Sequence, residues 1–183
     1  MQFETQCLHA GYQPKSGEPR VQPIVQSTTF TYDSAEDIGD LFDLKKAGFF
    51  YTRLANPTTK MPLKRNSRRC RRIVVHSTTK YLDGHAVAMG GVIIDGGNFN
   101  WNNGKFPAFT QPDDSYHGLI YTKTFGAAAY IVKARVQLMR DLGATPAPQN
   151  SFLLNLGMET LPLRMQAHYN NALQVAQYLE NNL

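Results

Sequence analysis

The chain has 183 residues, of which 42% are hydrophobic and 11% aromatic, and this balance is typical of a folded globular protein and excludes a disordered one. No apolar run reaches about 18 residues, so no membrane span is expected, and the first residues lack the apolar core of a signal peptide. Cys7 and Cys70 are too few for a disulfide framework or a metal site. Two thiols without an export signal predict a cytoplasmic protein.

The net charge of +5 comes from one short segment. Residues 60–72 hold seven Lys or Arg and no acid, and without them the balance is −2. This run has three interpretations: a contact with nucleic acid or another acidic surface, a solvated linker, or sequence read out of frame or mis-spliced between two genuine segments. We favour the third, because the composition is foreign to both sides and no nucleic-acid-binding signature accompanies it. We therefore expect no nucleic acid partner and no membrane partner.

The first third of the chain predicts little regular structure. Residues 1–20 are expected to form an irregular arm, because Gly and Pro recur through them. Residues 21–32 are rich in β-branched and aromatic side chains, but Pro23 argues against a central strand. Ser34 begins a capping pattern that predicts a short helix directly after it. Residues 49–59 predict an extended segment that ends in an Asn-Pro turn.

Two strands and a long loop are predicted in the middle of the chain. Residues 73–75 are three consecutive β-branched side chains, which predict a short buried strand. A polar loop follows, and residues 87–95 predict a second strand around a Gly-Gly pair. Residues 96–118 are dense in Gly, Asn, Pro and aromatics and predict a loop. A loop of this length is unusual unless it is functional or covers a partner.

The C-terminal third is predicted to be helical. Apolar residues recur at three- and four-residue steps over 125–142, and Gly143 then supplies a helix stop. A second apolar stripe runs over residues 158–181 and comprises Leu161, Met165, Tyr169, Ala172, Leu173, Ala176 and Leu179.

The segment VVHSTTKYLDGH, residues 74–85, is the candidate for chemistry. A lysine that reacts with an aldehyde must be held where its amine is neutral and accessible. The hydroxyls of Ser77 and Thr79, just before Lys80, lie on one side of an extended chain and can donate to a phosphate. From the residues alone, a solvated loop lysine remains the other interpretation. His76 and His85 match no zinc-ligand spacing and are read as loop histidines, so no metal site is predicted.

Three separated motifs resemble one enzyme family in that family's own order. HSTTKYLDGHAVAMGG resembles the cofactor-lysine segment of the Cys/Met-metabolism enzymes that depend on pyridoxal 5′-phosphate (PLP), and FFYTRLANPTT resembles their Y-[ST]-R-x-x-N-P-T motif. The opening ETQCLHAGYQP, with VQPIVQSTTFTYDS, is a third match. The closing half, from TFGAAAYIVKARVQLMRDLGATPAPQN onward, most resembles the O-acetylhomoserine sulfhydrylase branch. The matches cover about 3–59 and 73–183, so the basic run begins and ends where they stop and resume.

The resemblance implies an α/β fold: part of the large domain of a PLP-dependent transferase of the aspartate-aminotransferase type (fold type I), with an N-terminal arm. Residues 1–59 are then an arm and subunit-contact segment. Residues 60–72 are an anomalous basic linker, and residues 73–183 belong to the PLP-binding domain with its C-terminal helices.

The family also implies a role for each candidate residue. Lys80 is expected to carry PLP and to move protons, while Ser77 and Thr79 are expected to bond the cofactor phosphate. Tyr51 and Arg53 are expected to reach that phosphate from a neighbouring subunit, because the planar arginine fork pairs well with phosphate. The expected partners are an amino-acid substrate, O-acetylhomoserine, and other subunits, either a homo-oligomer (a tetramer in the family) or an intact homologue.

The sequence departs from the family after Asn56-Pro57-Thr58. The Gly turn that cradles the phosphate, the aromatic that stacks on the ring and the aspartate that pairs with the ring nitrogen have no counterpart here, and neither does the C-terminal domain with its carboxylate-binding arginine. We therefore expect an internally deleted and C-terminally truncated member, catalytically incomplete alone. The alternative is a non-catalytic fragment that associates with an intact homologue.

Overall fold

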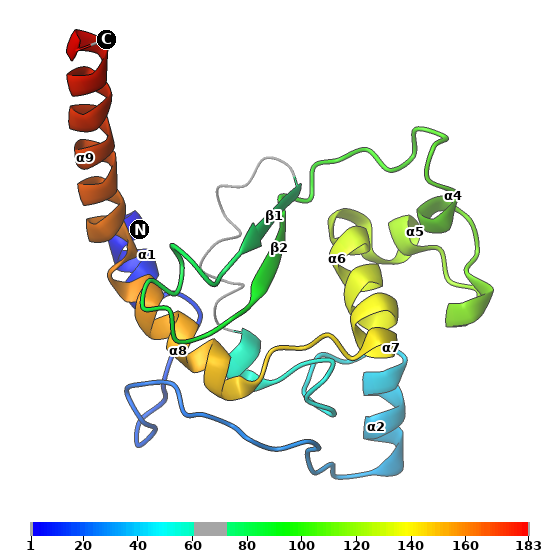
Figure 1. Ribbon diagram of the computed structural model, residues 1–183. Coiled ribbons are helices and arrows are strands. Elements are labelled where there is room, and N and C mark those ends of the chain that lie inside the picture. The colour runs from blue at the N-terminus through cyan, green and yellow to red at the C-terminus, as the bar shows by residue number, and fades with distance from the viewer. Residues whose placement is uncertain (1, 61–72, 183) are drawn as a thin grey trace.

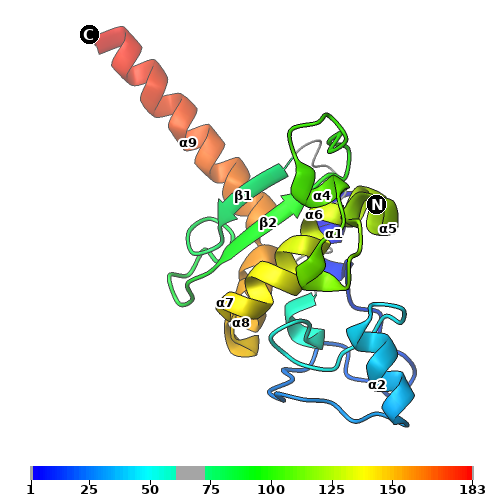
Figure 2. The same ribbon diagram turned by 90° about the vertical axis from the view of Figure 1, so that its right-hand side faces the viewer.

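The computed structural model describes residues 2–60 and 73–182, so the predicted basic linker lies outside the described residues except for Lys60. Figure 1 shows a strand pair near the centre, a group of short helices on one side of it, and a long C-terminal helix that projects away. Figure 2 shows the same projection from a second direction. Within the described residues, no helix is both long enough and apolar enough to cross a membrane.

The N-terminal arm begins with a helix, and the expectation of an irregular segment over 1–20 is wrong for that part. Helix α1 spans Phe3–His9 and buries Cys7. A seven-residue helix has little stability of its own, so its packing against α8 (Pro148–Glu159) stabilises it. That contact is long-range and leaves no local pattern. Beyond α1 the arm is irregular, as expected, with left-handed backbone at Gly11.

Helix α2 spans Ala35–Phe42 and confirms the predicted capping pattern. The Ser34 hydroxyl accepts the N–H of Asp37 at 3.1 Å, which satisfies one of the free donors of the first turn. The segments on either side of α2 meet at an antiparallel bridge between Thr29 and Tyr51. The expectation of an extended segment over 49–59 is wrong for most of it, because the chain turns over residues 52–54 and is helical from residue 57.

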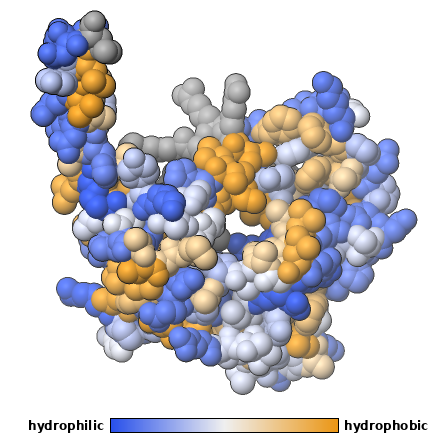
Figure 3. Space-filling model, viewed as in Figure 1, coloured by the Kyte–Doolittle hydropathy of each residue, from blue (hydrophilic) through white to orange (hydrophobic). Residues whose placement is uncertain are grey.

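The two predicted strands pair with each other in antiparallel fashion. Strand β1 spans Ile73–Ser77 and strand β2 spans Gly91–Asp95. The second strand begins later than predicted, because residues 87–90 belong to the preceding loop. The expectation of a buried first strand is wrong: Val74 is 41% and Val75 73% exposed, and because adjacent strand residues point to opposite faces, the described residues leave both faces of β1 partly uncovered. Figure 3 shows the resulting apolar surface over the strand pair.

The helix predicted over 125–142 is present but divided. A positive φ of 50° at Gly126 interrupts the helix. A π-helical stretch lies further along the run. Gly143 ends the run with a φ of 71°, which confirms the predicted stop. The pieces are α5 (Tyr121–Phe125), η2 (Gly126–Ala128), α6 (Ala129–Lys133), η3 (Ala134–Met139) and α7 (Arg140–Leu142).

The larger core lies between this helical run and the loop before it. Tyr121, Ala129 and Val136 are buried together with Tyr116. The expected loop over 96–118 contains two short helical pieces, and the aromatic side chains that made it look unusual pack it down. The pieces are α4 (Pro107–Thr110) and η1 (Asp114–Tyr116). The Trp101 ring lies 4.4 Å from that of Phe109 and 5.4 Å from that of Tyr130, measured between centroids.

Two helices end the chain. Helix α8 was not predicted before residue 158, because polar or small side chains such as Ser151 occupy buried positions and break the apolar stripe. Helix α9 spans Leu161–Asn182 and agrees with the predicted stripe in position. Its apolar residues are nevertheless exposed beyond Leu161; Tyr169, for example, is 64% exposed. The stripe marks an apolar face, and the described residues do not cover it.

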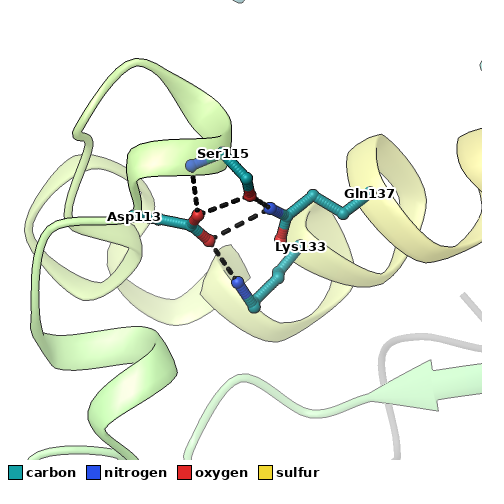
Figure 4. A network of polar contacts seen from close by, with 4 residues as sticks. All are labelled: Asp113, Ser115, Lys133 and Gln137. Atoms are coloured by element: carbon teal, nitrogen blue, oxygen red, sulfur yellow. Dashed lines mark hydrogen bonds and ion pairs between the residues drawn. The ribbon is translucent and has the colours of Figure 1, made fainter.

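A polar network fastens the loop before α5 to the helical run (Figure 4). Asp113 accepts from the Lys133 ammonium at 2.5 Å and from the Gln137 amide at 3.0 Å. The Ser115 hydroxyl donates to the other carboxylate oxygen at 2.6 Å. The Lys133 ammonium beside it is the main cause that lowers the pKa of Asp113 to about 2, although burial opposes that shift.

This network predicts a loss of stability in acid. The pKa of Asp113 is lower in the folded chain than its ordinary value of 3.8, so its contribution is complete above that value and disappears as the pH falls towards 2. The Asp113→Asn variant lacks this contribution at every pH. The difference in free energy of unfolding between wild type and variant is expected to shrink by about 2 kcal/mol between pH 5 and pH 2. Urea unfolding at each pH measures it, and a constant difference would contradict the ion pair.

Candidate functional site

The loop that carries Lys80 begins where β1 ends, at Ser77, and its backbone turns sharply. The N–H of Asp83 donates to the carbonyl of Thr78 at 2.9 Å. The N–H of Gly84 donates to the carbonyl of Lys80 itself at 2.8 Å. Gly84 has a φ of 75°, a conformation that favours glycine. Two backbone bonds therefore fix the chain on both sides of Lys80.

Side chains close the rest of the loop. The Thr79 hydroxyl accepts the N–H of Gly90 at 3.1 Å and donates to the carbonyl of the same residue at 3.3 Å. Asp83 is 1% exposed, and one of its carboxylate oxygens accepts the N–H groups of His85 and Val87 at 3.3 and 3.2 Å. A loop held at both ends in this way holds its lysine in a narrow range of positions.

A hollow of about 390 Å³ lies over this loop. The Lys80 side chain is exposed, and its amine makes no hydrogen bond or ion pair with any residue in 2–60 or 73–182. A free amine beside open space is what covalent attachment to an aldehyde requires. The other lining side chains are small or apolar, apart from one hydroxyl: Thr79, Gly84, Ala86, Val87, Ala88 and Met89.

The two predicted phosphate-binding hydroxyls differ in their surroundings. Thr79 lines the hollow beside Lys80, but its hydroxyl already bonds Gly90, so donation to a phosphate requires the long 3.3 Å bond to be given up. Ser77 is exposed at the end of β1 and does not line the hollow, and its hydroxyl has no partner in the described part of the chain. The structure thus brings Thr79 and Lys80 together and leaves Ser77 at the margin.

His85 lies in the loop, as predicted, but His76 lies in β1, so the prediction of a loop histidine is wrong there. The ring of His85 contacts the carbonyl of Asp83 at 2.8 Å, and that of His76 contacts the carbonyl of Ser77 at 2.5 Å. Among the residues that the structure describes, no three His, Cys, Asp or Glu side chains gather in an arrangement that could hold a metal ion.

Tyr51 and Arg53 lie on a turn away from the hollow, and neither lines it. Arg53 is exposed, and its guanidinium carbon lies 5.1 Å from the centroid of the Tyr51 ring, within the range of a cation–π contact. The structure therefore keeps this pair together but does not bring it to Lys80 within one chain.

A buried amide anchors that turn. Asn56 is fully buried, donates to the carbonyl of Val25 at 2.9 Å and accepts the N–H of Thr58 at 2.8 Å. The Thr58 hydroxyl in turn accepts the N–H of Val25 at 3.0 Å and donates to the carbonyl of Pro23 at 3.1 Å. These bonds tie the extended arm to the Asn-Pro turn that the sequence predicted.

Arg135 ties the same turn to the helical run. Its guanidinium donates to the carbonyl of Leu54 at 2.7 Å. Burial lowers the pKa of Arg135 below its ordinary value, and no acidic side chain in the described ranges pairs with it. Sequence reasoning missed this residue, because nothing in its helical segment marks it as partly buried.

Comparison with known proteins decides the family. The profile of the Cys/Met metabolism PLP-dependent enzymes matches residues 4–66 and 71–183. The chain belongs to this family. Residues 67–70 separate the two matched ranges. This interval is shorter than the basic run of residues 60–72, whose composition differs from that of its neighbours.

Curated relatives are about half identical to this chain over the stretch that aligns. The O-acetyl-L-homoserine sulfhydrylase of Leptospira meyeri is 53% identical over 118 residues, which are 60% of this chain and 27% of the relative. The homocysteine/cysteine synthase of Saccharomyces cerevisiae is 49% identical over 112 residues, 60% of this chain and 25% of the relative. The match thus spans about a quarter of the length of these proteins.

Solved structures confirm the predicted fold class. A Campylobacter jejuni protein described as an O-acetylhomoserine (thiol)-lyase, whose structure carries a pyridoxyl-lysine, matches 98% of this chain and 75% of its own with a TM-score of 0.87 at 21% identity. Cystathionine gamma-lyase from Lactobacillus plantarum matches 98% of this chain and 69% of its own with a TM-score of 0.65 at 17% identity. Both are fold type I enzymes of the predicted class.

The expected cofactor, PLP, is confirmed as the cofactor of this family. The residues at the hollow fit its aldehyde through the free Lys80 amine, and they offer its phosphate one hydroxyl, that of Thr79, beside small side chains. None of the lining residues is acidic, so they supply no ionic partner for the ring nitrogen. The hollow therefore fits covalent attachment better than full activation of the cofactor.

Proposed function

We propose that Lys80 binds PLP covalently and that the chain takes part in replacing the acetoxy group of O-acetylhomoserine with sulfide or a thiol. The observation that carries the proposal is the free Lys80 amine, held on a fixed loop beside a hollow of about 390 Å³. The substrate class is supported by the curated relatives, two of which are O-acetylhomoserine sulfhydrylase and homocysteine/cysteine synthase.

Each residue has a limited task in this proposal. Lys80 would hold PLP through its aldehyde carbon, and the lysine amine would be the group placed to remove the proton from the α-carbon of the substrate. Ser77 and Thr79 donate hydroxyl hydrogen bonds to the phosphate, which fixes the orientation of the ring. PLP, when bound, supplies the electron sink that makes the carbon acids of the substrate reactive. In the net reaction the bond from the γ-carbon to oxygen would break, acetate would leave with the electron pair, and the thiol sulfur would bond that carbon and give up its proton.

A second role, as a complementing subunit, is favoured by the position of Tyr51 and Arg53. Both lie away from the hollow of their own chain, and Arg53 is exposed. We propose that they contact the cofactor phosphate of another subunit, in a homo-oligomer or beside an intact homologue. Arginine suits this contact because its fork binds two phosphate oxygens at once.

The test of the cofactor is chemical trapping. The purified chain is incubated with PLP, reduced with borohydride and mapped by peptide mass. A near-stoichiometric pyridoxyl label on Lys80 is expected, and a chain without label there contradicts the proposal. A separate portion of the PLP-loaded chain, which has not been reduced, is given O-acetylhomoserine and sulfide, and released acetate and homocysteine are measured.

The complementing role is tested by mixing. An intact homologue that lacks its own tyrosine and arginine of the phosphate motif is combined with this chain. Recovery of sulfhydrylase activity is expected with the wild-type chain and not with the Tyr51→Phe, Arg53→Met variant. Equal recovery with both chains would exclude the role.

A further inference from the structure

Arg164 joins the Lys80 loop to the two C-terminal helices. It lies near the start of α9, and its guanidinium donates to the carbonyl of Tyr81 at 2.7 Å and to the carbonyl of Gly157, in α8, at 2.7 Å. Its third nitrogen donates to the hydroxyl of Thr160, between the helices, at 3.1 Å. One side chain thus bonds the residue after Lys80 and the end of α8 together.

The loop lies tightly against this guanidinium. A Cβ atom on Gly84 would lie 2.5 Å from the guanidinium carbon of Arg164, so the bare glycine backbone is what allows the contact. The Tyr81 ring meets the His168 ring of α9 edge-on, with the centroids 5.1 Å apart. The first turns of α9 therefore contact both the backbone and the side chain that follow Lys80.

We propose that Arg164 is a positioning residue for Lys80: it fixes the carbonyl of Tyr81, and through it the direction in which the lysine amine enters the hollow. This inference rests on the proposed role of Lys80 as the cofactor lysine. The link is direct, because Tyr81 follows Lys80 and the Lys80 carbonyl is itself bonded to Gly84, on which the guanidinium packs.

The bonding pattern explains why an arginine suits this place. Its planar fork presents donors in fixed directions, and here three nitrogens reach three acceptors: one in the loop, one in α8 and one between α8 and α9. A lysine has a single charged nitrogen and cannot span all of them at once. An apolar side chain of similar length leaves the carbonyls of Tyr81 and Gly157 without these donors.

The experiment compares Arg164→Met with Arg164→Lys and with Arg20→Met. Arg20 is exposed and makes no polar contact with the described residues, so it controls for the loss of one surface cation. The rate at which borohydride traps pyridoxyl label on Lys80 is measured for each full-length chain over a range of pH. Loading of Arg164→Met is expected to slow on the order of 10-fold or more, with partial recovery in Arg164→Lys and none of the effect in Arg20→Met.

A second measurement needs no cofactor. Amide hydrogen exchange of Asp83 and Gly84, compared with that of Asp37 and Thr58 in the arm, reports whether the loop loosens while the rest of the fold is intact. Selective loss of protection at the loop in Arg164→Met supports the positioning role. Unchanged protection together with wild-type loading overturns it. If even the wild-type chain gives no label on Lys80, the proposed function fails, and the exchange result alone then decides whether Arg164 holds the loop.

Discussion

Lys80→Arg is expected to reduce the pyridoxyl label trapped by borohydride to background. The substitution keeps a long cationic side chain in the same exposed position, but a guanidinium stays protonated at neutral pH and does not bond the aldehyde. The loss therefore reports the covalent bond rather than charge or folding. Mass measurement of the intact reduced chain, followed by peptide mapping, gives the stoichiometry.

The matched control is Lys105→Arg. Lys105 is exposed on the aromatic loop, does not line the hollow, and makes no side-chain polar contact with the described residues. Label in that variant is expected to equal that of the wild type. Equal label in all three chains would mean that PLP reacts with surface lysines at random, and the assignment of Lys80 would be wrong.

Gly157→Ala is expected to lower the free energy of unfolding by about 2 kcal/mol. A Cβ atom there would lie 1.8 Å from the carbonyl oxygen of Asp83 and 2.6 Å from its carbonyl carbon. Those are backbone atoms that no rotamer change can remove, so the Lys80 loop must move away from α8. Alanine favours the helix over glycine by about 1 kcal/mol, which offsets part of the overpacking. Urea unfolding followed by circular dichroism measures the change.

Gly39→Ala in α2 separates the two effects. Gly39 has open space around the position of a new Cβ and an ordinary helical backbone. Alanine there is expected to stabilise the chain by up to about 1 kcal/mol through helix propensity alone. If both substitutions change stability in the same direction and by the same amount, the contact between α8 and the loop is not as close as the structure has it.

The parts of the fold that sequence predicted are those set by neighbours in the chain. Ser34 caps α2 through a bond to a residue three positions away, and Gly143 stops the helical run by its own backbone conformation. Helix α1 could not be predicted, because packing on α8, more than a hundred residues later, supports it. The prediction of which residues are buried failed for a related reason. The apolar residues of β1 and α9 mark faces able to pack, and the sequence does not say what covers them.

The candidate site divides in the same way. One short motif contains Lys80, Ser77 and Thr79, so the sequence alone could predict them as site residues. Arg164 bonds Tyr81 across 83 positions, and Gly157 contacts the loop from the last turn of α8. No local pattern marks such contacts; an isolated glycine inside a helical stretch is the one available hint.

The anchoring of the turn that presents Arg53 has a kinetic consequence. Asn56 and Arg135 hold its backbone from two sides before any ligand arrives. Little backbone rearrangement is then left for the moment of encounter, so the on-rate for a phosphate group is expected to follow diffusion and the attraction between opposite charges. The association rate should fall when salt is added, because salt screens the attraction between opposite charges. It should also fall as solvent viscosity rises, since no slow conformational step limits it.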